Sequence, residues 1–456
     1  MKDFMRSLIL IGTSVILINC VAGKPSRWGQ FHGDLPNHGF QLIDSGFALS
    51  SSWISEPYKI TSASPVIGRD FQNREVIYVG TTDARLVAIR SEDGSRKWER
   101  SFDTVASAIS IVASASVSDK GDIYVITNHR IGDGRARSTL HKVDQFSNPK
   151  WSYPFPEGGF TTGSPKVLTM GADTLIFVYV SVDTAGDIQG ELFALRDDNK
   201  RVELLDRKPL GSCRYETVGS GPSIDDVFNS YKDVWDLVGD FPVASDESGI
   251  GLPDRFIEPT VAVVTGREKP LIAIADNLCS IGTFTWEGSE LSVLWREKHN
   301  FHKHSSAVVL ANGLMVFGRQ DGKVLAYDVE TGVKMWEYDA GQPVFATPAA
   351  PPGEFIFVVS KNHIQVIKAS DGTLILDNNL PRKLDLWGET HSSPAVTANR
   401  VYVATSEMLT VTYDLKTRGH DTNFRGNGLA SAAVGRDGAV YVVAADGTIR
   451  KYAGTK

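Results

Sequence analysis

Two histidines of this chain, His304 and His391, share a local motif in which two serines follow the histidine. Imidazole nitrogens bind divalent metals, and His299 and His302 lie close to the first of the pair. Only His304 and His391 recur at matching places in the chain, which favours hydrogen-bonded or exposed histidines over a metal centre. We therefore predict no metal site.

No other catalytic motif is recognisable in the sequence. It has no Gly-x-Ser-x-Gly turn, no phosphate-binding or dinucleotide loop, no His-Glu-x-x-His and no EF-hand spacing. The three cysteines, Cys20, Cys213 and Cys279, form neither a haem motif nor a paired zinc motif. Either a disulfide between Cys213 and Cys279 or two separately buried thiols fits an exported chain.

The charge of the chain argues against nucleic acid as a partner. The formal net charge is −7, and acidic and basic residues are interspersed without a basic run. Binding to phosphates requires a cationic face. We expect envelope proteins or peptides as partners, bound by a monomer within a complex.

A repeated sequence motif predicts the strands and turns that would position any functional site. Its clearest copies are Val79 to Ile89 and Phe317 to Asp328, and in both a tryptophan, Trp98 or Trp336, stands four residues after the next glycine. Trp53, Trp151 and Trp295 complete this set of five. Short strands and glycine turns that repeat at roughly 40 to 50 residues are typical of a β-propeller. Tryptophan at this spacing is interpreted as packing between blades.

Eight such units can be marked, which predicts an all-β, eight-bladed β-propeller of four-stranded antiparallel blades over residues 52–456. The last unit ends with three strands, whereas Trp53 precedes the first unit without a blade of its own. A strand from about Ser52 to Ile60 is therefore expected to close the ring by joining the C-terminal blade. An open or seven-bladed array is the alternative.

One stretch, residues 201–255, interrupts the repeats. Apolar residues from Ile224 to Val238 recur at helical spacing behind Ser223, with Asp226 as a capping partner. This predicts one helix-containing insertion, whose apolar side packs on its own domain or docks a partner.

The N-terminus has the form of an export signal over residues 1–22, followed by a segment, 23–51, that leads into the propeller. Lys2 and Arg6 precede an apolar stretch from Leu8 to Ile18. Leu17-Ile18-Asn19-Cys20 resembles a bacterial lipobox, which makes Cys20 the predicted lipidation site; ordinary cleavage after Ala22 is the alternative. We expect export to the periplasm or, through a lipid anchor, to the outer membrane of a diderm bacterium.

These residues resemble a known family. Trp28-x-Gln30-Phe31-x-Gly33-Asp34 with Asn37-x-Gly39, and the phrase Asp-Gly-x-Leu-x-Ala-x-Asp-x-x-Thr-Gly-x-x-x-Trp, are similar to those of bacterial PQQ-like β-propeller repeat proteins. That family includes quinone-dependent dehydrogenases and non-catalytic members, among them the propeller lipoprotein of the outer-membrane β-barrel assembly machinery. The resemblance therefore implies the fold more directly than the function.

In a propeller, the loops that enter the inner strands converge on the mouth of the central channel. The residues expected at this channel-mouth surface are Ser62, Thr162, His304, Phe345 and His391, with Trp387 and Glu389 just upstream. A quinoprotein would need carboxylates and amides around Ca²⁺, an aspartate base and adjacent cysteines, and this set lacks them. We predict a non-catalytic scaffold without a cofactor, possessing no catalytic residues, that supports outer-membrane protein assembly; the alternative is a PQQ-dependent dehydrogenase with Ca²⁺.

Overall fold

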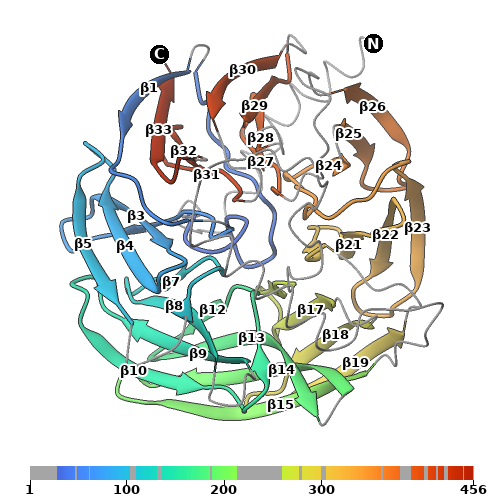
Figure 1. The fold of residues 1–456 in the computed structure, drawn as a ribbon. Helices are drawn as coiled ribbons and strands as arrows, with labels where there is room; N and C mark the ends of the chain where they lie inside the picture. Colours follow the sequence, from blue (N-terminus) through green and yellow to red (C-terminus); the bar gives the residue numbers. More distant parts are fainter. Residues whose placement is uncertain are drawn as a thin grey trace, which may run out of the picture.

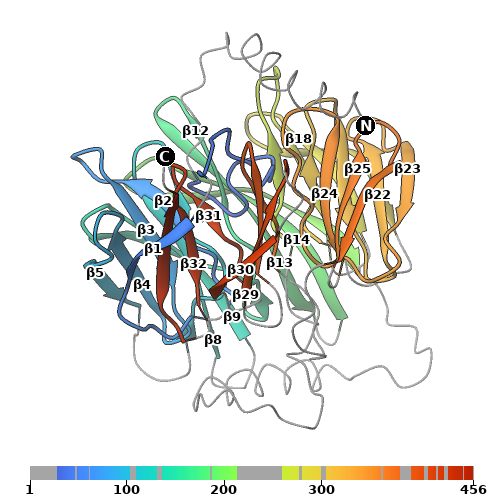
Figure 2. The same ribbon diagram turned by 90° about the horizontal axis from the view of Figure 1, so that it is seen from above.

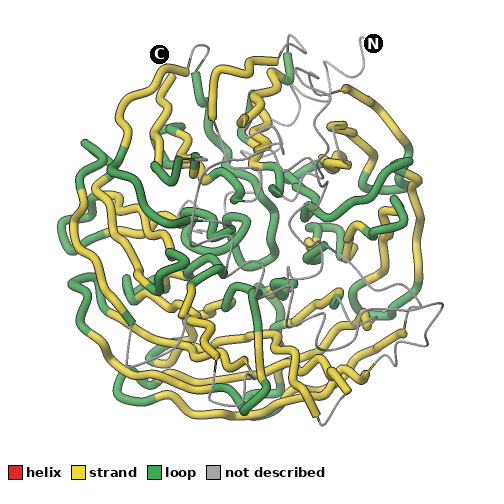
Figure 3. Tube along the Cα trace, in the orientation of Figure 1, coloured by secondary structure: helices red, strands yellow, loops and turns green. Residues whose placement is uncertain are grey.

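The computed structural model describes residues 28–46, 49–60, 62–102, 109–130, 136–184, 187–212, 259–276, 280–298, 305–360, 363–379, 392–404, 409–416, 420–425, 430–444 and 446–454. These residues form strands and loops arranged around a central axis (Figure 1). Figure 3 shows the same trace coloured by secondary structure, and no described residue is helical. Among them there is accordingly no helix that could span a bilayer.

The described strands form eight antiparallel sheets, numbered here in chain order. Sheet 1 contains β2 (Val66–Arg69), β3 (Glu75–Gly80), β4 (Arg85–Arg90) and β5 (Arg96–Ser101). Sheet 2 contains β6 (Ile109–Ser110), β7 (Ser116–Val117), β8 (Ile123–Arg130), β9 (Ala136–Val143) and β10 (Pro149–Pro154). Sheet 3 contains β11 (Gly159–Phe160), β12 (Lys166–Met170), β13 (Asp173–Thr184), β14 (Asp187–Asp197) and β15 (Val202–Ser212). Sheet 4 contains β16 (Ala262–Val264), β17 (Leu271–Ala275), β18 (Ser280–Trp286) and β19 (Leu291–Lys298).

The second half of the ring follows the same order. Sheet 5 contains β20 (Val308–Val309), β21 (Leu314–Gly318), β22 (Lys323–Asp328) and β23 (Lys334–Asp339). Sheet 6 contains β24 (Phe355–Ser360), β25 (His363–Lys368) and β26 (Leu374–Asn379). Sheet 7 contains β27 (Ala395–Val396), β28 (Arg400–Ala404), β29 (Leu409–Asp414) and β30 (His420–Arg425). Sheet 8 joins β31 (Ala433–Val434), β32 (Val440–Val443) and β33 (Ile449–Gly454) to β1 (Leu49–Ile54).

The propeller of four-stranded antiparallel blades is confirmed, but the prediction of eight complete blades is wrong. Seven sheets have four or more strands, whereas sheet 6 has three among the described residues. The bridge between Ala349 and Phe357 takes the place of an inner strand there. Pro348, Pro351 and Pro352 surround this bridge, and because proline has no N–H it cannot extend the ladder.

An N-terminal strand closes the ring, as the position of Trp53 predicts. β1 pairs antiparallel with β33, from Leu49 opposite Gly454 to Ile54 opposite Arg450. The strand lies earlier in the chain than the predicted Ser52 to Ile60, because pairing with β33 rather than local sequence sets its ends. Closure removes two exposed sheet edges.

The five repeat tryptophans all lie in outer strands and pack between sheets, as predicted. Each indole N–H is bonded to the next sheet along the ring: Trp53 to the Ser91 carbonyl at 2.9 Å, for example, and Trp98 to that of Gln145 at 2.9 Å. Gly94 has a φ of 75°, and a Cβ there would lie 2.5 Å from the Trp53 ring. The glycine of the repeat is therefore required both by its left-handed conformation and by the tryptophan that covers it.

The predicted insertion begins later than residue 201. β15, Val202–Ser212, is the outer strand of sheet 3 and pairs with β14. It lacks the tryptophan that five other outer strands carry and contains Pro209, so its sequence does not match the repeat. The remainder of the predicted insertion, including the predicted helix, lies outside the described residues.

Candidate functional site

The inner strands are held together by a ring of buried hydroxyls. Each sheet supplies one serine or threonine where its chain enters the centre, and all eight are at most 6% exposed. At six of the eight steps around the ring, the backbone N–H of one residue donates to the hydroxyl of the next, for instance Thr260 to Ser306 at 2.9 Å. The bond from Ser431 to Ser64, also 2.9 Å, joins sheet 8 to sheet 1. The eight residues are Ser64, Ser114, Ser164, Thr260, Ser306, Thr347, Ser393 and Ser431.

The predicted channel-mouth surface is described only in part. Ser62, Thr162 and Phe345 are half-buried and precede the hydroxyl ring in their sheets, and the Ser62 hydroxyl donates to the Val112 carbonyl of the next sheet at 3.1 Å. The other members fall outside the described residues: they are His304, Trp387, Glu389 and His391. The described residues contain no cluster of three potential metal ligands.

The cysteines also lie outside the described residues, but the chain on either side of two of them is placed. The Ser280 hydroxyl donates to the Leu210 carbonyl at 2.8 Å, between sheets 4 and 3. Cys213 follows Leu210 by three residues, and Cys279 directly precedes Ser280. The two chain segments that lead to these cysteines are therefore neighbours.

The segment from Trp28 to Gly46, which we name the cap, covers the opposite end of the channel. It is the dark-blue trace across the centre of the ring in Figure 1, and it lies at the top in Figure 2. It contacts the hairpin turns that follow the inner strands; for example, Ser45 N donates to Asn399 Oδ1 at 3.2 Å. This end is therefore the one where the inner strands finish.

The cap binds seven sheets at one equivalent position. In each of these sheets, one backbone N–H donates a hydrogen bond to the cap, and it belongs to the residue three positions after the serine or threonine of the hydroxyl ring. Six cap acceptors are backbone carbonyls and one is the Gln30 amide oxygen. The bonds run from Ile67 to Trp28 (2.6 Å), Val117 to Gly29 (2.7 Å), Val167 to Gln30 (3.0 Å), Val263 to Leu35 (2.8 Å), Val309 to Pro36 (3.1 Å), Ala350 to His38 (2.8 Å) and Val396 to Gly39 (2.7 Å).

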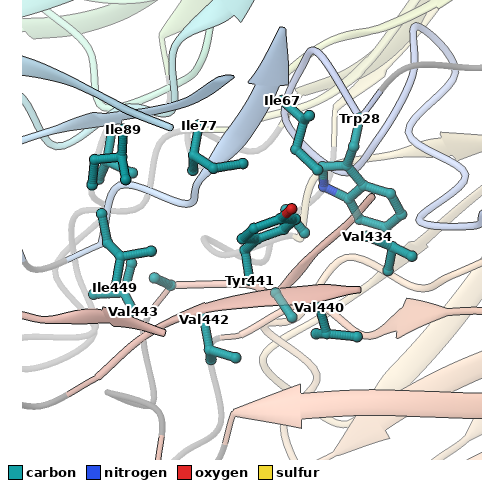
Figure 4. Close-up of a cluster of buried hydrophobic side chains, with 14 of the residues drawn as sticks. Trp28, Ile67, Ile77, Ile89, Val434, Val440, Tyr441, Val442, Val443 and Ile449 are labelled. Atoms are coloured by element: carbon teal, nitrogen blue, oxygen red, sulfur yellow. The ribbon is translucent and has the colours of Figure 1, made fainter. Parts of the chain in front are cut away.

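Hydrophobic packing holds the beginning of the cap where sheet 8 meets sheet 1. Trp28 is 3% exposed and belongs to the same buried cluster as Ile67 of sheet 1 and Val434 of sheet 8. Figure 4 shows these side chains together with Tyr441. The eighth sheet thus meets the cap through apolar contacts.

Special backbone conformations allow the cap to turn within this space. Asn37 has a φ of 64°, and Gly33 and Gly39 have φ values of 91° and 62°. The Asn37 side chain is fully buried and donates to the Ala307 carbonyl at 2.8 Å. Asparagine and glycine are the residues that tolerate this left-handed region best.

Buried ionisable groups fasten the interior of the cap. Lys166 of β12 is fully buried, and its Nζ donates to the carbonyls of Phe31 at 2.9 Å and Asp34 at 2.5 Å. Burial lowers the pKa of Lys166 to about 7, although the Asp34 charge opposes this. Burial likewise lowers the pKa of His32 to about 4, and its ring nitrogens contact the carbonyls of Asn37 at 2.7 Å and Pro394 at 2.9 Å.

Asp34 and His38 form an ion pair in the cap, with 2.7 Å between Oδ2 and Nδ1. Burial opposes the charge of both, but His38 holds the Asp34 pKa below its usual range and Asp34 raises the His38 pKa. The other ring nitrogen of His38 contacts the Val309 carbonyl at 2.9 Å. The side chains of Asp34 and His38 are therefore committed to positioning the backbone of the cap.

A second buried charge, between sheets 2 and 3, is also structural. Asp197 is fully buried and accepts hydrogen bonds from the Tyr124 hydroxyl at 2.6 Å, Lys142 Nζ at 2.6 Å and Trp151 Nε1 at 3.0 Å. Trp98 and Trp53 donate their indole N–H groups to backbone carbonyls of the next sheet. For Trp151 the Asp197 carboxylate takes the place of that carbonyl. The sequence analysis predicted neither the Asp197–Lys142 ion pair nor the cap. The turn residues Gly33, Asn37 and Gly39 could have indicated the cap, because they favour left-handed backbone conformations.

Comparison with known proteins identifies the family. A protein-family model described as "Outer membrane protein assembly factor BamB", of the PQQ-like repeat type, matches residues 52–203 and 290–417. The chain belongs to this family. A search of curated proteins found no match.

Solved structures share the fold at low sequence identity. A structure titled "Europium-containing methanol dehydrogenase" is 12% identical, with a TM-score of 0.62, and the match covers 97% of this chain and 100% of that one. The crystal structure of BamB from Moraxella catarrhalis is 17% identical, with a TM-score of 0.49 and coverage of 91% and 97%. The computationally designed Ika8 protein is 11% identical, with a TM-score of 0.50 and coverage of 88% and 99%.

Proposed function

We propose that this chain is a non-catalytic, exported propeller that binds proteins in the cell envelope and takes part in outer-membrane protein assembly. The match to the BamB family model is the observation that carries this proposal. The predicted export signal and the predicted lipidation of Cys20 agree with this proposal. Partners are expected at the channel mouth, because the cap covers the other end.

The alternative, a PQQ-dependent dehydrogenase, takes its support from the fold shared with methanol dehydrogenase. At 12% identity that likeness concerns the fold alone. The described residues do not fit the quinone and its Ca²⁺. Six ring hydroxyls accept N–H groups of neighbouring sheets, and of the two carboxylates in the cap, Asp34 is paired with His38 and Asp44 accepts a hydrogen bond from the Asn399 amide. Calcium prefers several free carboxylate and carbonyl oxygens.

Site-specific cross-linking tests the scaffold. A photoreactive residue at Thr162, at the channel mouth, should capture an outer-membrane assembly protein in cells. The same residue at Lys334, an exposed position on β23 near the opposite end, is the matched control and should capture less of that protein. Equal capture at both positions, or none at Thr162 and Ser62, would contradict binding at the mouth.

The alternative is tested with purified protein. Addition of PQQ and Ca²⁺ should leave both the melting temperature and dye reduction unchanged. A thermal shift together with dye reduction would establish the dehydrogenase instead. Lipidation is tested separately, because Cys20→Ser should move the chain from the membrane to the soluble fraction, and an unchanged partition would exclude the anchor.

A further inference from the structure

Exposed apolar side chains gather at the capped end of the propeller. Among the described residues, eleven large hydrophobic side chains are exposed, and Ile54 is the one that lies at the opposite end. Phe71, Phe146 and Val333 occupy hairpin turns and are 63%, 55% and 56% exposed. Scattered apolar residues are ordinary on a protein surface, but concentration at one end marks an interaction surface.

The direction of the strands places these turns at one end. In an antiparallel blade, the turn after the first strand and the turn after the third strand lie at the same end. Phe71 lies between β2 and β3, the first two strands of sheet 1. Phe146 and Val333 lie between the third and fourth strands of sheets 2 and 5. The exposed Leu42 belongs to the cap itself, so all four residues share the capped end.

Direct contact supports this placement. The rings of Phe71 and Phe146, from neighbouring sheets, have centroids 5.6 Å apart. Met170, the last residue of β12, is exposed at the next hairpin. The remaining exposed residues lie in the first halves of the outer strands β15, β19, β23 and β26, which start from this end.

The first described residue of the chain, Trp28, lies at the same end. Trp28 is buried in the cap, and Cys20 precedes it by eight residues. Eight residues reach about 29 Å at full extension. A lipid on Cys20 would therefore hold the capped end, rather than the channel mouth, close to the membrane.

We propose that the capped end docks on a phospholipid bilayer, with Phe71, Phe146 and Val333 inserted among the headgroups. The proposal rests on the proposed function, since it uses the anchor at Cys20. Separate apolar tips around a ring suit a planar membrane surface. A net charge of −7 without a basic cluster means that apolar contacts, not attraction to anionic lipids, supply the affinity. Docking in this orientation leaves the channel mouth free for proteins.

Vesicle binding by the full mature chain carrying Cys20→Ser tests the face without the anchor. We expect measurable co-sedimentation with vesicles of phosphatidylethanolamine and phosphatidylglycerol that persists at high salt and weakens as phosphatidylglycerol increases. Phe71→Ser and Phe146→Ser should each lower the partition coefficient about three- to tenfold. Ile54→Ser is the matched control, because this residue is 53% exposed at the opposite end, and it should change nothing.

Three outcomes would overturn the docking proposal. They are no vesicle binding by the Cys20→Ser chain, equal losses with Ile54→Ser, and loss of an envelope protein partner in the Phe71 and Phe146 variants while vesicle binding stays unchanged. The last outcome would assign this face to a protein. Cross-linking from Thr162 reports separately on the proposed scaffold function, so failure of one proposal is distinguishable from failure of the other. Near-ultraviolet circular dichroism verifies that each variant is folded.

Discussion

The buried lysine under the cap leads to a specific prediction about pH. The pKa of Lys166 is lowered from 10.5 to about 7 by burial. Between these two values the unfolded chain binds more protons than the folded chain. The free energy of unfolding should therefore rise with pH across this window, and Lys166→Met should abolish that part of the rise.

The size of the effect follows from the two pKa values. One pKa unit corresponds to about 1.4 kcal/mol, so a lysine that titrates near 7 when folded contributes about 2–3 kcal/mol of added stability between pH 7.5 and 9.5. Methionine has a similar length and suits an apolar site. It leaves the carbonyls of Phe31 and Asp34 without this donor, a cost of about 1–3 kcal/mol for each that does not depend on pH.

Urea unfolding followed by tryptophan fluorescence at pH 7.5, 8.5 and 9.5 measures this difference. The wild-type chain should gain stability over Lys166→Met as pH rises, whatever the offset between them. Lys334→Met, at an exposed lysine, is the control and should run parallel to the wild type. A constant difference between wild type and Lys166→Met at all three pH values would refute the inferred burial of a titrating amine.

Three further predictions concern the ring. Gly94→Ala should lower the free energy of unfolding by about 2–4 kcal/mol, because the added methyl group would meet Trp53 of the closing strand. Gly171→Ala is the control, since Gly171 also has a positive φ but open space around it, and it should cost about 1 kcal/mol. Equal urea midpoints for the two variants would contradict the tryptophan contact. Asp197→Asn should cost about 2–3 kcal/mol, because it removes the fully buried one of the two carboxylates that pair with Lys142 and leaves Asp122, and a loss below 1 kcal/mol in the same assay would refute this. Thiol titration in denaturant should find Cys213 and Cys279 unreactive until a reductant is added, since the chains that lead to them are neighbours; two free thiols before reduction would exclude the disulfide.

Much of the fold could be predicted because its determinants are local and repeated. Trp98 and Trp336 lie at fixed distances from the glycines of their hairpins, so one pattern gave the outer strand, the turn and the contact with the next sheet. Trp53 gave ring closure by the same reasoning. These features need no knowledge of which distant segments meet.

Features that depend on distant pairing could not be predicted. The cap is a nonrepeating segment, and its role appears only when the carbonyls of Trp28 and Gly39 meet inner strands up to 357 residues away, as Gly39 does at Val396. β15 was read as part of an insertion because its place in sheet 3 depends on pairing with β14 and not on the repeated phrase. The buried Asp197 could not be recognised from the sequence for the same reason, since its partners come from another sheet.

The N-terminal residues both cap the channel and close the ring, and this order along the chain affects how the ring responds to tension from an anchor. Residues 28–46 bind seven sheets across the end of the channel, and β1 then completes sheet 8. Tension on an anchor at Cys20 would reach the hydrogen bonds of the cap before it reached β1, because the cap lies between them in the chain. All seven bonds of the cap, each to a different sheet, would have to open before this tension reached β1. The cap thus protects the closure of the ring from the attachment that we propose for this protein.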